Sequence, residues 1–175
     1  MTDAQLVKYI IKNKKLPRTF DDYINFIVLL LPLMFTVLGA VALHRYLFFD
    51  KYLFLVLAGI FFVITGPLFM YLTITRLKQN VTFSIIPNER NLDINQIVNL
   101  ISNNFKLDNI KVDQKHSKIS AITKMTAFSW GEKITIVITG SEVLINSRPS
   151  GGRQPYTIMK DVKNVKLIRS LILRQ

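Results

Sequence analysis

Basic residues cluster at two places in the last third of the chain, and their types and spacing suit the binding of an anion. The first cluster is the run RPSGGR, in which Arg148 and Arg153 flank a proline, a serine and two glycines. Glycines leave backbone N–H groups free to cradle an anion, and two arginines can clamp a phosphate. A lipid headgroup or a nucleotide phosphate fits this pattern. The alternative is a flexible connection between a strand and a helix, with solvated arginines.

The second cluster lies in the closing segment 161–173, where apolar residues recur at helical spacing. Lys163, Lys166 and Arg169 could face anionic lipid headgroups, each contributing about 1 kcal/mol near a membrane surface. A solvated helix face is the equal alternative. Nucleic acid is not an expected partner, because the basic residues are not interleaved with exposed aromatic residues and the only tryptophan, Trp130, lies in a turn region.

Catalytic and metal-binding patterns are absent from the sequence. It has no cysteine, which excludes disulfides, thiolate metal sites and a cysteine nucleophile. His44 and His116 are expected far apart, and zinc and iron sites need three or four ligands held together. No G-x-S-x-G, G-x-G-x-x-G or Walker A motif occurs. We therefore predict a protein that is not an enzyme, with no catalytic residues, no metal and no cofactor.

The elements that must position these residues begin with two uncharged apolar runs, residues 23–43 and 52–75. A helix rises about 1.5 Å per residue, so roughly 20 apolar residues cross a hydrocarbon core of about 30 Å. The short link between the runs predicts a transmembrane helical hairpin over residues 21–78. The alternative, two helices inside a soluble core, is disfavoured because the rest of the chain is too short to cover them.

Small residues within the two runs predict where the helices of the hairpin pack. Gly39 and Ala40 near the end of the first run, with Gly59 and Gly66 in the second, allow helix backbones to approach closely. Neither run contains an ionisable residue, which argues against a transporter or pump acting alone.

The distribution of lysine and arginine predicts the orientation of the hairpin. The formal net charge is +12, and the basic residues flank the outer ends of the hairpin, whereas the link at 44–51 contributes only Arg45 and Lys51. Cytoplasmic flanks of membrane spans carry an excess of lysine and arginine. We therefore expect two spans in the inner membrane of a bacterial cell, with both termini in the cytoplasm.

The N-terminal segment, residues 1–20, has the pattern of a short amphipathic helix. Leu6, Val7, Ile10 and Ile11 fall on one face, with lysines elsewhere. This pattern is typical of a helix that lies in the membrane interface, with its lysines near anionic headgroups. A solvated, frayed tail is the alternative.

Residues 79–175 predict a small cytoplasmic α+β domain, because the apolar runs shorten and alternate with turn signals. The order is β-α-β-β-β-β-α, and the simplest arrangement is one antiparallel sheet with helices on one face. Strict alternation at 133–139 predicts a strand with Ile134, Ile136 and Ile138 on one face. Strands are expected at 81–86, 110–113, 118–123, 133–139 and 143–147, helices at 93–105 and 161–173, and a loop at 148–155.

A resemblance is visible in the last third of the chain. Ser129-Trp130-Gly131, the alternating strand at 134–138, a second strand ending in Ser147-Arg148 and a closing helix with Asn164-Val165 resemble the C-terminal part of small, uncharacterised two-transmembrane proteins of Bacteroidota. The layout, a hairpin before a cytosolic α/β domain, is similar to bacterial membrane-anchored PH-like proteins, although the helix at 93–105 departs from a PH barrel. Neither resemblance implies a particular chemistry.

Three hypotheses for the function, from different classes, remain open. The first is a non-enzymatic accessory or scaffold subunit of an inner-membrane complex, which docks on other integral membrane proteins through the hairpin and the cytoplasmic domain and forms a hetero-oligomer. The second is a membrane-anchored lipid- or phosphate-binding module that uses Arg148, Arg153 and the basic closing helix. An enzyme with an unrecognised site is the third and least favoured hypothesis.

Overall fold

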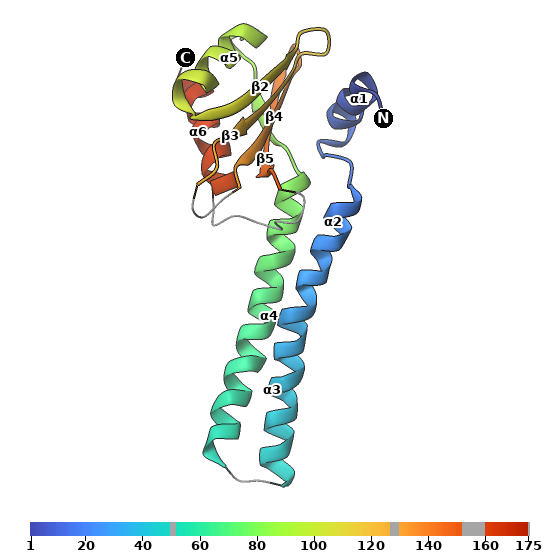
Figure 1. Ribbon diagram of the computed structural model, residues 1–175, viewed down its shortest axis with the longest axis vertical. Coiled ribbons are helices and arrows are strands. Elements are labelled where there is room, and N and C mark those ends of the chain that lie inside the picture. Colours follow the sequence, from blue (N-terminus) through green and yellow to red (C-terminus); the bar gives the residue numbers. More distant parts are fainter. Residues whose placement is uncertain (50–51, 127–129, 152–159, 175) are drawn as a thin grey trace. The chain divides into compact units, whose positions relative to one another are not determined.

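The computed structural model describes residues 1–49, 52–126, 130–151 and 160–174, which form two compact units (Figure 1). One unit is Phe20–Lys78, and the other combines Met1–Thr19 with Gln79–Gln175. The N-terminal segment is therefore part of the α+β domain, which corrects the expectation that residues 1–20 stand apart from it.

The hairpin unit contains two helical stretches that are long and apolar enough to cross a membrane. The first stretch, Phe20–Phe48, consists of α2, η1 and α3, and the second, Leu53–Val81, is the single helix α4. Large apolar side chains on both stretches are exposed, as lipid-facing residues would be and core residues of a soluble protein would not. The bounds within the first stretch are Phe20–Ile24 for α2, Asn25–Leu29 for η1 and Leu30–Phe48 for α3.

Proline accounts for the irregular first stretch. Pro32 is the third residue of α3, and it has no N–H to donate to the carbonyl of Val28. The turn that precedes the proline is a 3₁₀ helix, η1, rather than α-helix. Thr36 compensates locally, because its hydroxyl donates a hydrogen bond of 2.9 Å to the carbonyl oxygen of Pro32.

Glycines lie where α3 and α4 approach most closely. A Cβ atom added to Gly39 would come within 2.8 Å of the backbone nitrogen of Val63, and one added to Gly66 would come within 2.9 Å of the backbone nitrogen of Thr36. Gly59 faces α3 in the same way, whereas Ala40 is exposed. The glycines thus form the contact between the two helices of the hairpin, not a surface that is free to dock on another membrane protein.

The α+β domain is built on a five-stranded antiparallel sheet with the strand order β1-β5-β4-β3-β2. The sequence of elements, β1-α5-β2-β3-β4-β5-α6, agrees with the predicted order. The bounds are Ser84–Pro87 for β1, Leu107–Asp113 for β2, Lys118–Thr123 for β3, Glu132–Ile138 for β4, Glu142–Pro149 for β5, Ile94–Asn104 for α5 and Lys160–Arg174 for α6.

Helices α5 and α6 cover the first face of the sheet. Ile119, Ile136 and Ile145 lie side by side across β3, β4 and β5 and are fully buried. They belong to the main hydrophobic core, to which α5 contributes Ile97 and Ile101 and α6 contributes Ile168 and Ile172. Strand alternation places every second residue on this face, so Ile134, Ile136 and Ile138 of the KITIVIT run share one layer.

Helix α1, Asp3–Asn13, covers part of the second face, which corrects both the one-sided arrangement and the interfacial helix predicted from the sequence. Its Val7 and Ile10 are buried in a second hydrophobic cluster with Val137 of β4 and Leu144 of β5. Val137 and Leu144 are opposite each other and point away from the first core, so they need a cover of their own. Ion pairs from Lys118 to Asp3 and from Lys14 to Glu142 tie this region to the sheet.

The segments that flank the hairpin in sequence are bridged to each other inside the domain. Lys15 and Thr82 form an isolated antiparallel bridge, and the N–H of Leu16 donates a hydrogen bond of 2.7 Å to the carbonyl oxygen of Val81. The amide nitrogen of Asn146 in β5 donates to the carbonyl oxygen of Thr82 at 2.9 Å. We call the end of the sheet beyond Asn146, where β3 and β5 end and β4 begins, the hairpin end.

Candidate anion-binding surface

Arg148 and Pro149 lie in strand β5, which corrects the start of the loop predicted at 148–155, whereas residues 152–155 lie outside the described residues. Arg148 is directly opposite Lys133 of β4, and Pro149 ends the strand one residue later. Arg153 lies outside the described residues. Two cations therefore face each other across neighbouring strands at the hairpin end, an arrangement that is normally destabilising.

Lys133 shows the electrostatic cost of this arrangement. Its side chain is half-buried, and burial lowers its pKa below the ordinary 10.5. The neighbouring charges of Arg148, Lys118 and Lys111 lower the pKa further, and all three are cations. The pairing register places all four side chains on the second face of the sheet. Lys118, at one end of this basic face, is paired with Asp3 of α1, and Lys133 and Arg148 lie at the other end.

Exposed apolar side chains stand at the same hairpin end. Trp130, just before β4, is 61% exposed, and Met125, just after β3, is 70% exposed. Gly131 follows the tryptophan with a φ of +89°, and a Cβ there would lie 2.4 Å from the carbonyl oxygen of Thr123. Only glycine fits this turn. The hydroxyl of Ser150 donates a 2.6 Å hydrogen bond to the carbonyl oxygen of Trp130, which holds the two loops together.

The basic residues predicted in the closing helix form a separate group. Lys163, Lys166 and Arg169 are all exposed on α6, which packs on the first face of the sheet. Arg148 and Lys133 project from the second face, so the sheet itself separates the two groups. The predicted site residues therefore make two basic surfaces rather than one.

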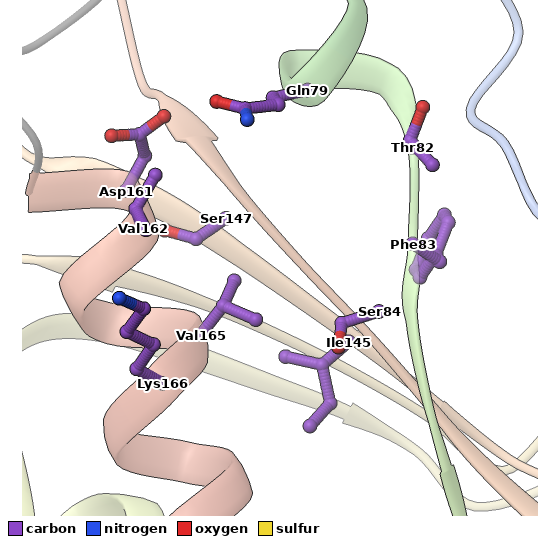
Figure 2. Close-up of a pocket in the computed structure, with 10 residues that line it drawn as sticks. All are labelled: Gln79, Thr82, Phe83, Ser84, Ile145, Ser147, Asp161, Val162, Val165 and Lys166. Carbon is purple, nitrogen blue, oxygen red and sulfur yellow. The ribbon is translucent and has the colours of Figure 1, made fainter. Parts of the chain in front are cut away.

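A pocket of about 290 Å³ lies between β1, β5 and α6 (Figure 2). Ile145, Val162 and Val165 give it an apolar wall, and Lys166 lies at its edge. Asp161 also lines it, with an exposure of only 2%. Sequence reasoning missed this carboxylate. A signal was present, because Asp161 is the only acid in an otherwise basic closing helix.

The remaining titratable groups offer no metal site in the described ranges. His116 is not a freely solvated loop residue, since its Nδ1 is 2.8 Å from Oδ2 of Asp113. This hydrogen bond lowers the pKa of Asp113 below its ordinary value. Within the part of the chain that the structure covers, no three His, Cys, Asp or Glu side chains converge to hold a metal ion.

Comparison with known proteins does not assign a family. No protein-family model matches the chain, and no curated protein and no solved structure matches it either. The function is therefore argued from the geometry of the domain and from the two apolar helices.

Proposed function

We propose that this protein is a membrane-anchored, non-enzymatic module whose α+β domain binds phosphate-bearing lipid headgroups at its hairpin end. The observation that carries this proposal is the pair Lys133 and Arg148, two cations opposite each other on neighbouring strands. A phosphate would bridge the two side chains, because its oxygens accept hydrogen bonds from both cations.

The chain itself supplies a reason for the anion to be a lipid. Asn80, whose carbonyl accepts a hydrogen bond from Asn146, follows Thr75 at the end of the apolar run by five residues. Five residues span at most about 18 Å, so the hairpin end of the sheet is tethered close to the bilayer whatever the orientation of the domain. Trp130 and Met125 suit this location, since an exposed indole is favoured at a membrane interface.

The two chain segments that make up the α+β domain support the proposed membrane topology. Met1–Thr19 and Gln79–Gln175 form one compact unit, so both flanks of the hairpin belong on the same side of a membrane. The excess of lysine and arginine on these flanks favours the cytoplasmic side. We propose two spans in a bacterial inner membrane with cytoplasmic termini. Reporter fusions at the C-terminus and in the link at 44–51 test this, and a cytoplasmic signal from the link contradicts it.

The test of headgroup binding uses Trp130, the only tryptophan, as an internal probe. The full-length protein is placed in nanodiscs of neutral or anionic lipid that contain a fluorescence quencher at headgroup depth. We expect stronger quenching in anionic nanodiscs and a decline with salt, because the Debye length falls from about 10 Å at 0.1 M to about 3 Å at 1 M. Lys133→Gln and Arg148→Gln should each weaken the quenching, whereas Lys115→Gln, in the turn between β2 and β3, should not.

Two results would contradict the proposal. Quenching that is equal in neutral and anionic nanodiscs would show that charge does not bring the hairpin end to the membrane. Quenching that is absent in both would show that Trp130 does not reach the headgroups.

A second candidate function is the accessory subunit of an inner-membrane complex. Leu167 and Leu173 are exposed on α6 among its lysines and arginines, and an apolar residue on a basic helix suits a protein partner better than headgroups alone. The partner would be another integral membrane protein in a hetero-oligomer. Purification in mild detergent tests this. Stoichiometric membrane proteins that are lost with Leu167→Ser support it, and a lone monomer rejects it.

A further inference from the structure

One carboxylate oxygen of Asp161 is buried without a hydrogen-bond partner in the described part of the chain. Only 2% of the residue is exposed, and its Oδ1 has no hydrogen-bond partner among the described residues. A buried charge without a partner is costly, so its retention calls for a ligand or a structural role. Asp161 lies in the first turn of α6, and no backbone N–H of that turn donates a hydrogen bond to its Oδ1.

The surroundings of Asp161 indicate what kind of donor fits. In Figure 2, Asp161 and Gln79 lie toward one end of the pocket, and Ile145 and Val165 line the part below them. Lys166 contributes a cation at the edge and forms no ion pair with Asp161 among the described contacts. The pocket thus has separate acidic, basic and apolar parts. Its volume of about 290 Å³ is at the lower limit of small-molecule sites, which begin at roughly 300 Å³.

We propose that this pocket binds a phosphate ester that carries a primary amine, as in the headgroup of an ethanolamine phospholipid. The ammonium donates hydrogen bonds to Asp161, the phosphate pairs with Lys166, and the first methylenes contact Ile145, Val162 and Val165. This inference rests on the proposed lipid-facing role of the domain and adds a headgroup preference to it.

Hydrogen-bond chemistry determines the expected selectivity. A primary ammonium has three N–H donors, whereas the quaternary ammonium of choline has none and cannot satisfy Oδ1 of Asp161. A site built around a hydrogen bond rejects an analogue that lacks the donor. A serine headgroup adds a carboxylate that Asp161 repels. Ethanolamine lipid is therefore preferred over choline and serine lipids with the same acyl chains.

The experiment measures which lipids stay bound to the full-length protein. Nanodiscs with equal amounts of ethanolamine and choline lipid are dissolved in mild detergent, and the retained lipids are identified by native mass spectrometry. We expect a preference of roughly tenfold for ethanolamine lipid, in line with one hydrogen bond to a charged group. Asp161→Asn should reduce it to less than about twofold, and Asp108→Asn, an exposed control on β2, should leave it unchanged.

Two further variants separate binding from folding. Val162→Phe fills the pocket and should remove the bound lipid while Asp161 stays in place. Lys166→Gln should lower the retained amounts of ethanolamine and choline lipid by the same factor, because both headgroups carry the phosphate. Thermal unfolding is measured beside each variant, and we expect Asp161→Asn to unfold at the same temperature as wild type or higher. A lower temperature, with an unchanged lipid ratio, would assign Asp161 a purely structural role and overturn the inference.

A soluble arm identifies the source of the ligand. Hydrogen exchange of the segment 160–174 is measured with O-phosphoethanolamine and with O-phosphocholine. If O-phosphoethanolamine alone slows exchange, and the effect is lost in Asp161→Asn, the pocket binds the headgroup chemistry as proposed. If no lipid is retained in the first experiment, the ligand is then a soluble phosphate ester. Absence of selectivity in both arms overturns the inference. It leaves the headgroup binding by Lys133 and Arg148 unaffected, because that binding is measured by quenching of Trp130 and depends on anionic lipid.

Discussion

Replacing Lys133 with glutamine should make the domain more stable and its membrane contact weaker. The Cβ atoms of residues directly opposite on neighbouring strands are about 5 Å apart. Charges on splayed side chains then lie about 7 Å apart, and their repulsion is roughly 0.6 kcal/mol in water and about 2.4 kcal/mol at an effective dielectric constant near 20. Because solvent reaches the half-buried Lys133, we take about 1 kcal/mol as the repulsion that is relieved.

This stability gain has a measurable size and a pH dependence. For a domain of roughly 100 residues, 1 kcal/mol raises the unfolding temperature by about 4 °C. In the wild type the folded pKa of Lys133 is lowered, so between that pKa and 10.5 the unfolded state binds more protons. The stability contributed by Lys133 therefore increases as pH rises through this window and is complete above 10.5. The glutamine variant should lack this increase.

The assay combines unfolding and binding on the same full-length samples in nanodiscs. Unfolding of the sheet is followed by hydrogen exchange of the β3–β5 segments, since the hairpin remains helical in lipid. Binding to anionic lipid, followed by Trp130 quenching, should weaken about fivefold, because one basic residue near the surface contributes about 1 kcal/mol. Lys115→Gln removes the same charge from an exposed turn and should change neither quantity. A glutamine variant that is less stable than wild type would refute the reasoning.

Three other predictions concern the core of the α+β domain, the contact between α3 and α4 inside the hairpin, and the ion pair between Asp113 and His116. Ile136→Ala, at a fully buried position of β4, should lower the free energy of unfolding by about 2–5 kcal/mol, whereas Ile85→Ala, 42% exposed on β1, should lower it by less than about 1 kcal/mol; equal losses in hydrogen exchange would contradict the core assignment. Gly66→Leu should separate α3 from α4 and reduce cross-linking between single cysteines introduced into the two helices, while Gly140→Ala, with open space around its Cβ position, should leave the cross-linking unchanged. His116→Ala should raise the pKa of the Asp113 carboxyl toward 3.8 in an NMR titration, and an unchanged pKa would show that their hydrogen bond is not formed in solution.

The sequence predicted the features that depend on periodicity. Uncharged runs of helical length indicate α3 and α4, and strict alternation around Ile136 indicates β4 whatever lies across the sheet. The position of α1 was not predictable in this way, because the apolar face with Val7 and Ile10 has the same spacing whether it meets lipid or a sheet. Val137, which packs against α1, lies between Ile136 and Ile138 in the sequence. The pattern around it therefore indicates the first face of the sheet and gives no sign that the second face is also covered.

The candidate site was predicted only in part, for a related reason. Arg148 was recognised as a candidate anion-binding residue, but Pro149 and the glycines that follow suggested a loop, and the strand register that pairs it with Lys133 cannot be read from one strand alone. Asp161 was overlooked because burial of a charged residue depends on what packs around it. Both residues acquire their significance from neighbours that are distant in the sequence.

The pairing of α1 with the sheet also has a consequence for the order of assembly. Val7 and Leu144, which share a hydrophobic cluster, are separated by the whole hairpin and most of the domain. At about 5–20 residues per second, the ribosome completes β5 on the order of ten seconds after α1 emerges. During that interval α3 and α4 are synthesised while α1 has no sheet to cover. The second face of the sheet can close only after β5 has been made, so α1 is the first helix to be synthesised and among the last to find its packing partner.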